Sequence, residues 1–186
     1  MTRREQIADA GVRLIARSGM RALTHRAVDA EAALPPGSTS YYARTRRDLT
    51  ALVVDRLADY TQADLNGLTI PDALTPAEAV QLAEGFLDLL ARRGDAQAAR
   101  FALLFELRGD EELRASLTAD APVRQALIKA AEKILQAVGI AEPSQHAPDL
   151  VGLVDALLMY RTAQAAPVNA ARVLRAYISG LLLDER

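Results

Sequence analysis

Residues 19–49 of this 186-residue chain read GMRALTHRAVDAEAALPPGSTSYYARTRRDL. In this stretch Gly19 can end a preceding helix, and Thr24 can cap a short helix that extends to about residue 32. The pair Pro35-Pro36 then forces a new start, because proline is tolerated in the first turn of a helix but not in its interior. We expect a third short helix from Pro36 to Tyr42. The spacing therefore predicts two short helices joined by a tight turn.

The flanking sequence predicts more helices on both sides. Residues 3–18 place Ile7, Gly11, Leu14 and Ile15 on one helical face, and a longer helix begins near Asp48 and breaks at Asn66-Gly67. Start and stop signals, including a capping box at residues 75–78, predict helices at about 76–94, 95–109, 110–117, 120–139, 148–166 and 167–183, with a linker at 140–147. Alanine and leucine dominate, and aromatic residues make up 4% of the chain. The fold class is therefore expected to be all-α, with about nine helices.

The composition excludes several classes of protein. At 51% hydrophobic and 25% charged residues, the chain is typical of a folded globular protein. It has no cysteine, and His25 and His146 are far apart, so we expect no metal site and no cofactor. No phosphate-binding glycine loop or nucleophile elbow favours an enzyme. The N-terminus lacks the apolar segment of a signal peptide, and no apolar run is long enough to span a membrane, so a cytoplasmic protein is expected.

The charges are unevenly distributed. Residues 1–50 carry a net charge of +4, and the remainder carries −6, which gives −2 for the chain. A basic first part followed by an acidic second part indicates that only the first part meets an anion such as DNA. Chance clustering explains the same numbers, so the charge pattern supports DNA binding only together with the helical motif.

The residues from Gly19 to Leu49, with the apolar spacing of the first helix, resemble the DNA-binding domain of the tetracycline-repressor (TetR/AcrR) family. The match includes Thr24 and Arg26, Gly37-Ser38 and Tyr41-Tyr42, and it continues through Arg46, Asp48 and Leu49. The resemblance implies a helix-turn-helix domain at residues 1–47 and a helical effector-binding and dimerisation domain at residues 48–186. It further implies a homodimeric repressor that binds an inverted-repeat operator in double-stranded DNA and that a small molecule releases.

In a helix-turn-helix, the second helix presents side chains to the major groove, while flanking residues contact phosphates. Small polar residues suit base contacts, and a helix N-terminus, tyrosines and arginines suit phosphate contacts. For His25, a solvent-facing position is expected. The candidate DNA-binding residues are Thr24, Arg26, Gly37, Ser38, Thr39, Tyr41, Tyr42, Arg44 and Arg46.

Four residues depart from the family pattern. Ala33 stands where the turn usually has glycine, so this residue either avoids a positive φ or is strained by about 1 kcal/mol. Pro35-Pro36 replaces the usual Ser-Lys, which removes one cation, and Ala43 replaces a phenylalanine anchor. The cluster Arg44, Arg46 and Arg47 is a candidate source of compensating positive charge.

The last two predicted helices are apolar around most of their circumference, so we expect each to be buried on two sides. The second side is assigned to another copy of the chain in a two-fold four-helix interface, while central helices of a monomer would show the same pattern. The candidate interface residues are Leu150, Leu153, Val154, Leu157, Leu158, Arg161, Leu174, Tyr177, Ile178 and Leu181.

A mainly apolar effector pocket is expected among the middle helices, with Arg100, Glu106 and Arg161 as polar neighbours, although ordinary core packing would also place these residues inside. A mainly apolar pocket lining indicates a hydrophobic or aromatic effector. Two other functions stay open: a helical protein-interaction module without specific DNA binding, and an activator of the same architecture. The candidate pocket residues are Leu82, Phe86, Leu89, Phe101, Leu104, Phe105, Leu127, Met159 and Tyr160.

Overall fold

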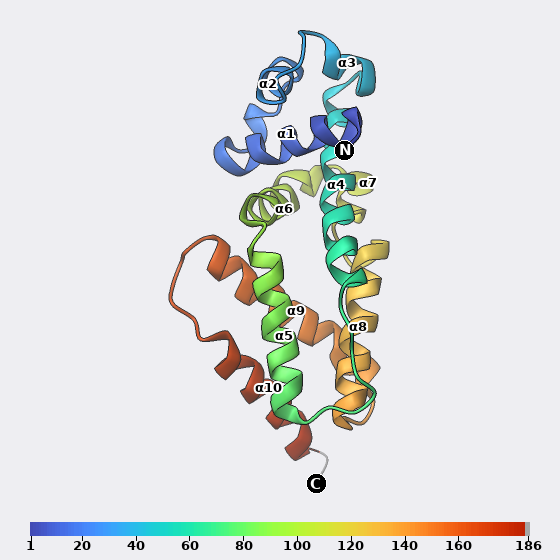
Figure 1. Cartoon of the computed structure of the whole chain (residues 1–186), viewed down its shortest axis with the longest axis vertical. Coiled ribbons are helices and arrows are strands. Elements are labelled where there is room, and N and C mark those ends of the chain that lie inside the picture. The colour runs from blue at the N-terminus through green and yellow to red at the C-terminus, as the bar shows by residue number, and fades with distance from the viewer. Residues whose placement is uncertain (185–186) are drawn as a thin grey trace. The chain divides into compact units, whose positions relative to one another are not determined.

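A computed structural model describes residues 1–184, and these residues form helices and no strand (Figure 1). Two short 3₁₀ turns, Met20–Ala22 and Leu107–Gly109, join neighbouring α-helices. The all-α prediction is confirmed, with ten α-helices in the described part of the chain. They are α1 (Arg3–Ser18), α2 (His25–Glu31), α3 (Ser38–Tyr42), α4 (Arg46–Asn66), α5 (Pro76–Ala91), α6 (Gly94–Glu106), α7 (Glu111–Ala115), α8 (Pro122–Val138), α9 (Pro143–Thr162) and α10 (Ala170–Asp184).

Most helix boundaries follow the local signals. Gly19 ends α1 with φ 73°, and Thr75 forms a capping box with Glu78 at the start of α5. The expectation of a linker at residues 140–147 is wrong, because α9 starts at Pro143 and contains Pro148 in its interior. Pro143 occupies the first turn, where its missing N–H costs nothing, so the helix start lies one proline earlier than expected.

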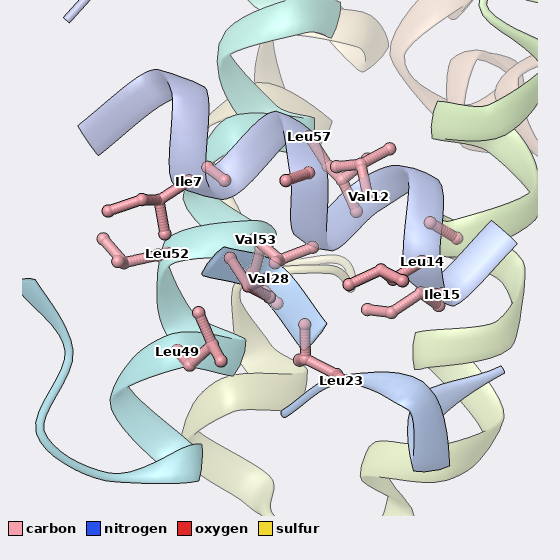
Figure 2. Close-up of a cluster of buried hydrophobic side chains, with 14 of the residues drawn as sticks. Ile7, Val12, Leu14, Ile15, Leu23, Val28, Leu49, Leu52, Val53 and Leu57 are labelled. Carbon is pink, nitrogen blue, oxygen red and sulfur yellow. The ribbon is translucent and has the colours of Figure 1, made fainter. Parts of the chain in front are cut away.

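The chain divides into two compact units, and the first consists of residues 1–63 and 93–122. Its core brings together apolar side chains of α1, α2 and α4, which point toward one another in Figure 2, and α6 also packs against α1. Ile7, Val28, Leu49 and Val53 are fully buried there. The packing unit thus extends beyond residue 47, while the functional division after Arg47 stays a prediction.

The second unit consists of residues 64–92 and 123–186, of which residues up to 184 are described. In it α5 packs against α9 and α10. The buried side chains include Leu87 of α5, Leu135 of α8, Leu158 of α9 and Leu174 of α10. The two final helices therefore contribute to the interior of their own chain.

The turn between α2 and α3 contains backbone strain at Ala33. The N–H of Leu34 donates to the carbonyl of Asp29 at 2.8 Å, and the N–H of Ala33 donates to that of Ala30 at 3.1 Å, which is the Schellman pattern that ends many helices. Ala33 takes φ 53°, the left-handed conformation that this pattern demands and that glycine adopts most easily. Of the two alternatives for this position, the strained backbone is therefore the one observed.

The variant Ala33→Gly is expected to raise the free energy of unfolding by about 0.5 to 1 kcal/mol. Relief of the left-handed alanine gives about 1 to 2 kcal/mol, and the greater freedom of glycine in the unfolded chain removes part of that gain. Urea unfolding measures the change. The same substitution at Ala30, inside α2, should lower the free energy of unfolding, so a loss in both variants would contradict the strain at Ala33.

Candidate DNA-binding site and effector cavity

The short helix α3 presents only part of its surface to solvent. Ser40 is exposed, Tyr41 is 84% exposed and Tyr42 is 39% exposed. The two tyrosine rings form an edge-to-face pair with centroids 5.1 Å apart. Ser40 and Tyr41 are thus the α3 side chains most available to a DNA groove, and Ser40 is not among the residues that the sequence pattern predicted.

Two of the candidate base-contacting residues have hydroxyls with partners inside the protein. Thr39 is fully buried, and its hydroxyl donates to Asp29 Oδ1 at 2.6 Å. Ser38 is half-buried, and its hydroxyl donates to the carbonyl of Pro35 at 2.6 Å. The expected start of the helix at Pro36 lies two residues before the observed start at Ser38. The expectation that Thr39 faces a base edge is not met, because its side chain holds α3 against α2.

Asp29 of α2 binds the first turn of α3. Its carboxylate accepts hydrogen bonds from the N–H of Gly37 and the N–H of Thr39, each at 2.7 Å, and from the Thr39 hydroxyl. Burial raises the pKa of Asp29, but the hydrogen bonds from Thr39 and Gly37 outweigh this and hold the pKa below its usual value. Gly37 takes φ 90° and makes no side-chain cap, so Asp29 supplies the oxygen that a capping residue normally provides.

His25 binds the other end of the same helix. Its Nε2 lies 2.8 Å from the carbonyl oxygen of Ala43 and donates to it in the tautomer that carries the proton there. The side chain is half-buried, so the expectation of a solvent-facing histidine is wrong.

One signal for Asp29 exists in the sequence: an acidic residue near the C-terminal end of a short helix opposes the helix dipole and needs a compensating partner.

The arginines around α3 fall into two groups. Arg46 donates to the carbonyl of Met20 at 2.6 Å, and Arg47 pairs with Asp110 and Glu112 at 2.9 and 2.7 Å. Arg26 and Arg44 are exposed, and neither guanidinium forms an ion pair within the described residues 1–184. Thr24, also exposed, caps α2 by accepting the N–H of Ala27 at 3.2 Å. Arg26 and Arg44 are therefore the cations with the greatest freedom to reach phosphates.

The second unit contains a narrow apolar cavity of about 50 Å³. The single charged side chain in its lining, Asp155, is held by Arg124 at 2.5 Å. Ligand sites for drug-sized molecules commonly span about 300 to 1,000 Å³, so a bound effector of that size requires this cavity to widen. The lining residues are Leu65, Leu68, Ala83, Phe86, Leu90, Leu127, Ala130, Ala131, Ile134, Leu150, Val151, Val154 and Asp155.

Only part of the predicted pocket coincides with this cavity. Phe86 and Leu127 line it, whereas Leu82 and Leu89 are half-buried elsewhere on α5. A further open hollow of about 420 Å³ is lined by Leu157, Tyr160 and Arg161 together with residues of the α9–α10 loop. The remaining predicted residues are Phe101, Leu104 and Phe105, which lie on α6 in the first unit, and Met159, which is exposed on α9.

The polar neighbours expected at the pocket lie apart from the cavity lining. Arg100 donates to Gln97 at 3.1 Å and its guanidinium carbon lies 4.4 Å from the centre of the Phe101 ring. Glu106 is exposed at the end of α6, and Arg161 pairs with Asp88 of α5. The sequence pattern identified charged residues near apolar ones, but not the pair Arg124–Asp155 at the cavity.

The predicted dimer residues separate into inner and outer positions. Leu153, Tyr177 and Leu181 are half-buried, Val154 is half-buried and lines the apolar cavity, and Arg161 is exposed. The outer face of α9 instead carries Gly152, Ala156, Met159 and Tyr160, at helical spacing. The inner positions, already buried within the chain, are Leu150, Leu157, Leu158, Leu174 and Ile178.

Within residues 1–184, no helix is both long and apolar enough to cross a membrane. The same part of the chain contains no group of three or more histidine, cysteine, aspartate or glutamate residues placed to hold a metal ion.

Solved structures with the same fold include several regulators. A transcriptional regulator from Rhodococcus sp. Rha1 shares 19% identity with a TM-score of 0.78, over 98% of this chain and 97% of that one. A TetR-family member from Streptomyces coelicolor A3 shares 22% identity with a TM-score of 0.70, over 97% and 98%. The multidrug binding protein EbrR, complexed with ethidium, shares 20% identity with a TM-score of 0.67, over 97% and 98%.

No curated protein sequence matches this chain significantly. Residues 74–184, more than half of the chain, match the family described as tetracyclin repressor-like, C-terminal domain. The sequence of the second half and the helical fold of both halves agree with the resemblance first seen at residues 19–49. The chain therefore belongs to the tetracycline-repressor family of transcriptional regulators.

Proposed function

We propose that this protein is a homodimeric transcriptional repressor that binds an inverted-repeat operator through α2 and α3 and leaves it when a small apolar molecule enters its second unit. The observation that carries the proposal is the arrangement of α3: both of its ends are hydrogen-bonded to α2, while Ser40 and Tyr41 face solvent. A helix held in this way can enter a major groove without rearranging.

The surrounding charges support DNA as the partner. Arg26 and Arg44 flank α3 and lie exposed, and the first 50 residues carry a net charge of +4. Thr24, Tyr42 and Arg46 are further candidates for backbone contacts, and Ser40 joins Tyr41 as a candidate for base contacts. Contacts to phosphates position the protein, whereas contacts to base edges select the sequence.

A two-fold dimer supports an inverted-repeat operator. The outer face of α9, with Gly152 and Ala156, has small side chains that allow a second helix to approach closely. Two heads would then address half-sites about 34 to 36 Å apart, one turn of DNA. We therefore place the dimer contact on the outer faces of α9 and α10.

The effector proposal rests on the apolar cavity. Its lining is almost entirely aliphatic, with Phe86 as the aromatic member and the pair Arg124–Asp155 as the polar end. A ligand that widens the cavity lowers operator affinity if it binds better to a conformation with the wrong spacing of the heads. The binding of ethidium by EbrR, which has the same fold, supports an apolar or aromatic effector.

The first experiment is selection of tightly bound DNA from a random pool by the purified protein at fixed salt. Enrichment of a two-fold inverted repeat supports the proposal. Binding that depends only on salt, without enrichment, contradicts it and favours the protein-interaction module. The enriched operator then serves as the probe for variants and for effectors that release it.

The variants Arg26→Ala and Arg44→Ala are each expected to weaken operator binding about 50-fold near 0.1 M salt, because each removes one phosphate-contacting cation from each protomer and therefore two from the dimer. Each should also reduce the slope of log affinity against log salt by about two, one for each half-site. Fluorescence anisotropy with the selected operator measures both quantities. Lys129→Ala, which removes an exposed cation from α8, is the matched control and should change neither. Equal effects of all three variants would argue against a DNA site at α3.

A further inference from the structure

We infer that Asp29 is the positioning residue of the recognition helix: its carboxylate holds the first turn of α3 at the rotation that turns Ser40 and Tyr41 outward. This inference rests on the proposed DNA-binding function. Asp29 is 4% exposed, so it cannot itself contact DNA without leaving its three hydrogen bonds to Gly37 and Thr39. Its contribution to binding must therefore act through α3.

The length of α3 explains why it needs such a residue. A helix of five residues is unstable alone, because the cost of its first turn is repaid by very few hydrogen bonds. Gly37 provides no side-chain cap, and Thr39 is the fully buried side chain of the helix. Apolar packing alone therefore provides little to fix the rotation of α3.

The spacing of Asp29 and His25 on α2 shows how the two residues hold α3 at both ends. Asp29 binds the N-terminal end of α3, and His25, four residues earlier on the same face of α2, lies 2.8 Å from the Ala43 carbonyl at the other end. Thr39 donates both its N–H and its hydroxyl to one oxygen of Asp29, so its side chain is turned inward. Ser40 and Tyr41, about 100° and 200° around the helix from Thr39, are consequently turned to solvent.

Asp29→Asn tests the inference with almost no change of shape. A carboxylate accepts at both oxygens, whereas an amide places an NH₂ donor against the N–H of either Gly37 or Thr39. We expect the amides of α3 to exchange hydrogen at least tenfold faster in this variant without DNA. We also expect the affinity for the selected operator to fall at least tenfold, with exchange in α1 and α4 unchanged.

Three companion variants distinguish positioning from a general loss of stability. Thr39→Ser keeps the hydroxyl and the N–H, and its operator affinity should stay within twofold of the parent. Thr39→Val loses one of the three hydrogen bonds to Asp29, and its operator affinity should lie between those of the parent and Asp29→Asn. Leu57→Ala removes a buried side chain of α4 far along the chain from α3. It should lower the unfolding midpoint while leaving the operator affinity of the folded protein and α3 exchange near parental values.

The inference is overturned if Asp29→Asn leaves α3 exchange unchanged, or if its loss of affinity is matched by Leu57→Ala at equal fraction folded. These results are separable from failure of the proposed function. If the parent protein enriches no operator, the repressor proposal fails, and α3 exchange still decides whether Asp29 holds the helix. If the parent enriches an operator and Asp29→Asn binds it equally well, only the role of Asp29 fails.

Discussion

The variant Asp9→Ala is expected to lower the free energy of unfolding by about 2 to 3 kcal/mol at neutral pH, because it removes the acceptor of the Tyr60 hydroxyl and the nearer of the two carboxylates that pair with Arg56. Asp9 of α1 accepts from Arg56 Nε at 2.6 Å and from the Tyr60 hydroxyl at 2.5 Å. The side chains of Asp9 and Arg56 are 17% and 18% exposed, so water replaces the lost contacts only in part. The guanidinium of Arg93 also stacks on the Tyr60 ring, 4.8 Å from its centre.

The effect of Asp9→Ala should depend on pH in one direction. Burial raises the pKa of Asp9, but the hydrogen bonds from Arg56 and Tyr60 outweigh it, and the pKa lies below its usual value. A carboxyl with a lowered pKa in the folded state contributes its stabilisation above the ordinary value of about 3.9 and loses it as the pH falls through the folded value. The difference between parent and variant should therefore shrink below about pH 4.

Urea unfolding at fixed protein concentration, at pH 7 and in acid, measures both effects. The matched comparison is the double variant Asp9→Ala/Arg56→Met, which also removes the guanidinium that donates to Asp9. The double variant should lose less free energy of unfolding than Asp9→Ala and Arg56→Met lose together, by about 1 kcal/mol or more. Additive losses, or a difference that persists unchanged in acid, would mean that the Asp9–Arg56 contact does not stabilise the first unit.

The variant Gly11→Val is expected to lower the free energy of unfolding by about 3 kcal/mol, because α1 contacts α4 at a point with no room for a side chain. A Cβ at position 11 would lie 2.5 Å from Val53 Cγ2 and 3.2 Å from Leu23 Cδ1. Val53 is fully buried and branched at Cβ, so it cannot swing away without taking a strained rotamer. For Gly11→Ala the expected loss is about 1 to 2 kcal/mol, since alanine regains part of the cost through its higher helix propensity.

Two further variants identify the cause. Gly11→Ala combined with Val53→Ala removes the clashing methyl group. The double variant should lose less free energy of unfolding than the two single variants lose together. Gly85 is an exposed glycine of α5 at which an added Cβ would meet no neighbouring side chain within 4 Å, so Gly85→Ala should instead raise the free energy of unfolding by about 1 kcal/mol. Thermal and urea unfolding report all of these values. A stabilising Gly11→Ala would refute the close contact between α1 and α4.

Local signals predicted most of the fold. Residues 3–18 form α1 with the predicted bounds, and Thr24 and Thr75 cap the helices that they were expected to start. Capping and termination depend on residues within four positions of one another, so a sequence contains the information directly. The start of α9 was missed because two prolines, Pro143 and Pro148, offered the same signal.

The two short helices of the candidate DNA-binding segment were predicted, but the exposure of their side chains was predicted only in part. The segment from Thr24 to Arg46 contains the two short helices. The sequence pattern favoured Ser38, Thr39 and Tyr41 for base contacts, but of these only Tyr41 is exposed, and the exposed Ser40 was missed. On a helix of five residues, a shift of one position rotates the side chain by about 100°. That rotation is set by Asp29, ten positions before Thr39, and no local pattern records the pairing.

The effector cavity shows the same difference. Hydrophobic spacing marked Phe86, Phe101, Leu104 and Leu127 as apolar positions, but it did not specify the surface against which each one packs. Phe86 and Leu127 line the cavity, whereas α6, with Phe101 and Leu104, belongs to the unit in which it packs on α1.

The sequence by itself determined the helical class, most helix ends, the family and the segment proposed to bind DNA, because these depend on local propensity, capping and a contiguous motif. The tertiary structure alone decided which face of α3 is exposed, which arginines are already paired and which apolar residues surround the cavity. Those properties depend on contacts between residues far apart in the chain, such as Asp29 with Thr39 and Arg47 with Asp110. Periodicity indicates that a side chain is buried, whereas only the packing of the folded chain shows which residues it contacts.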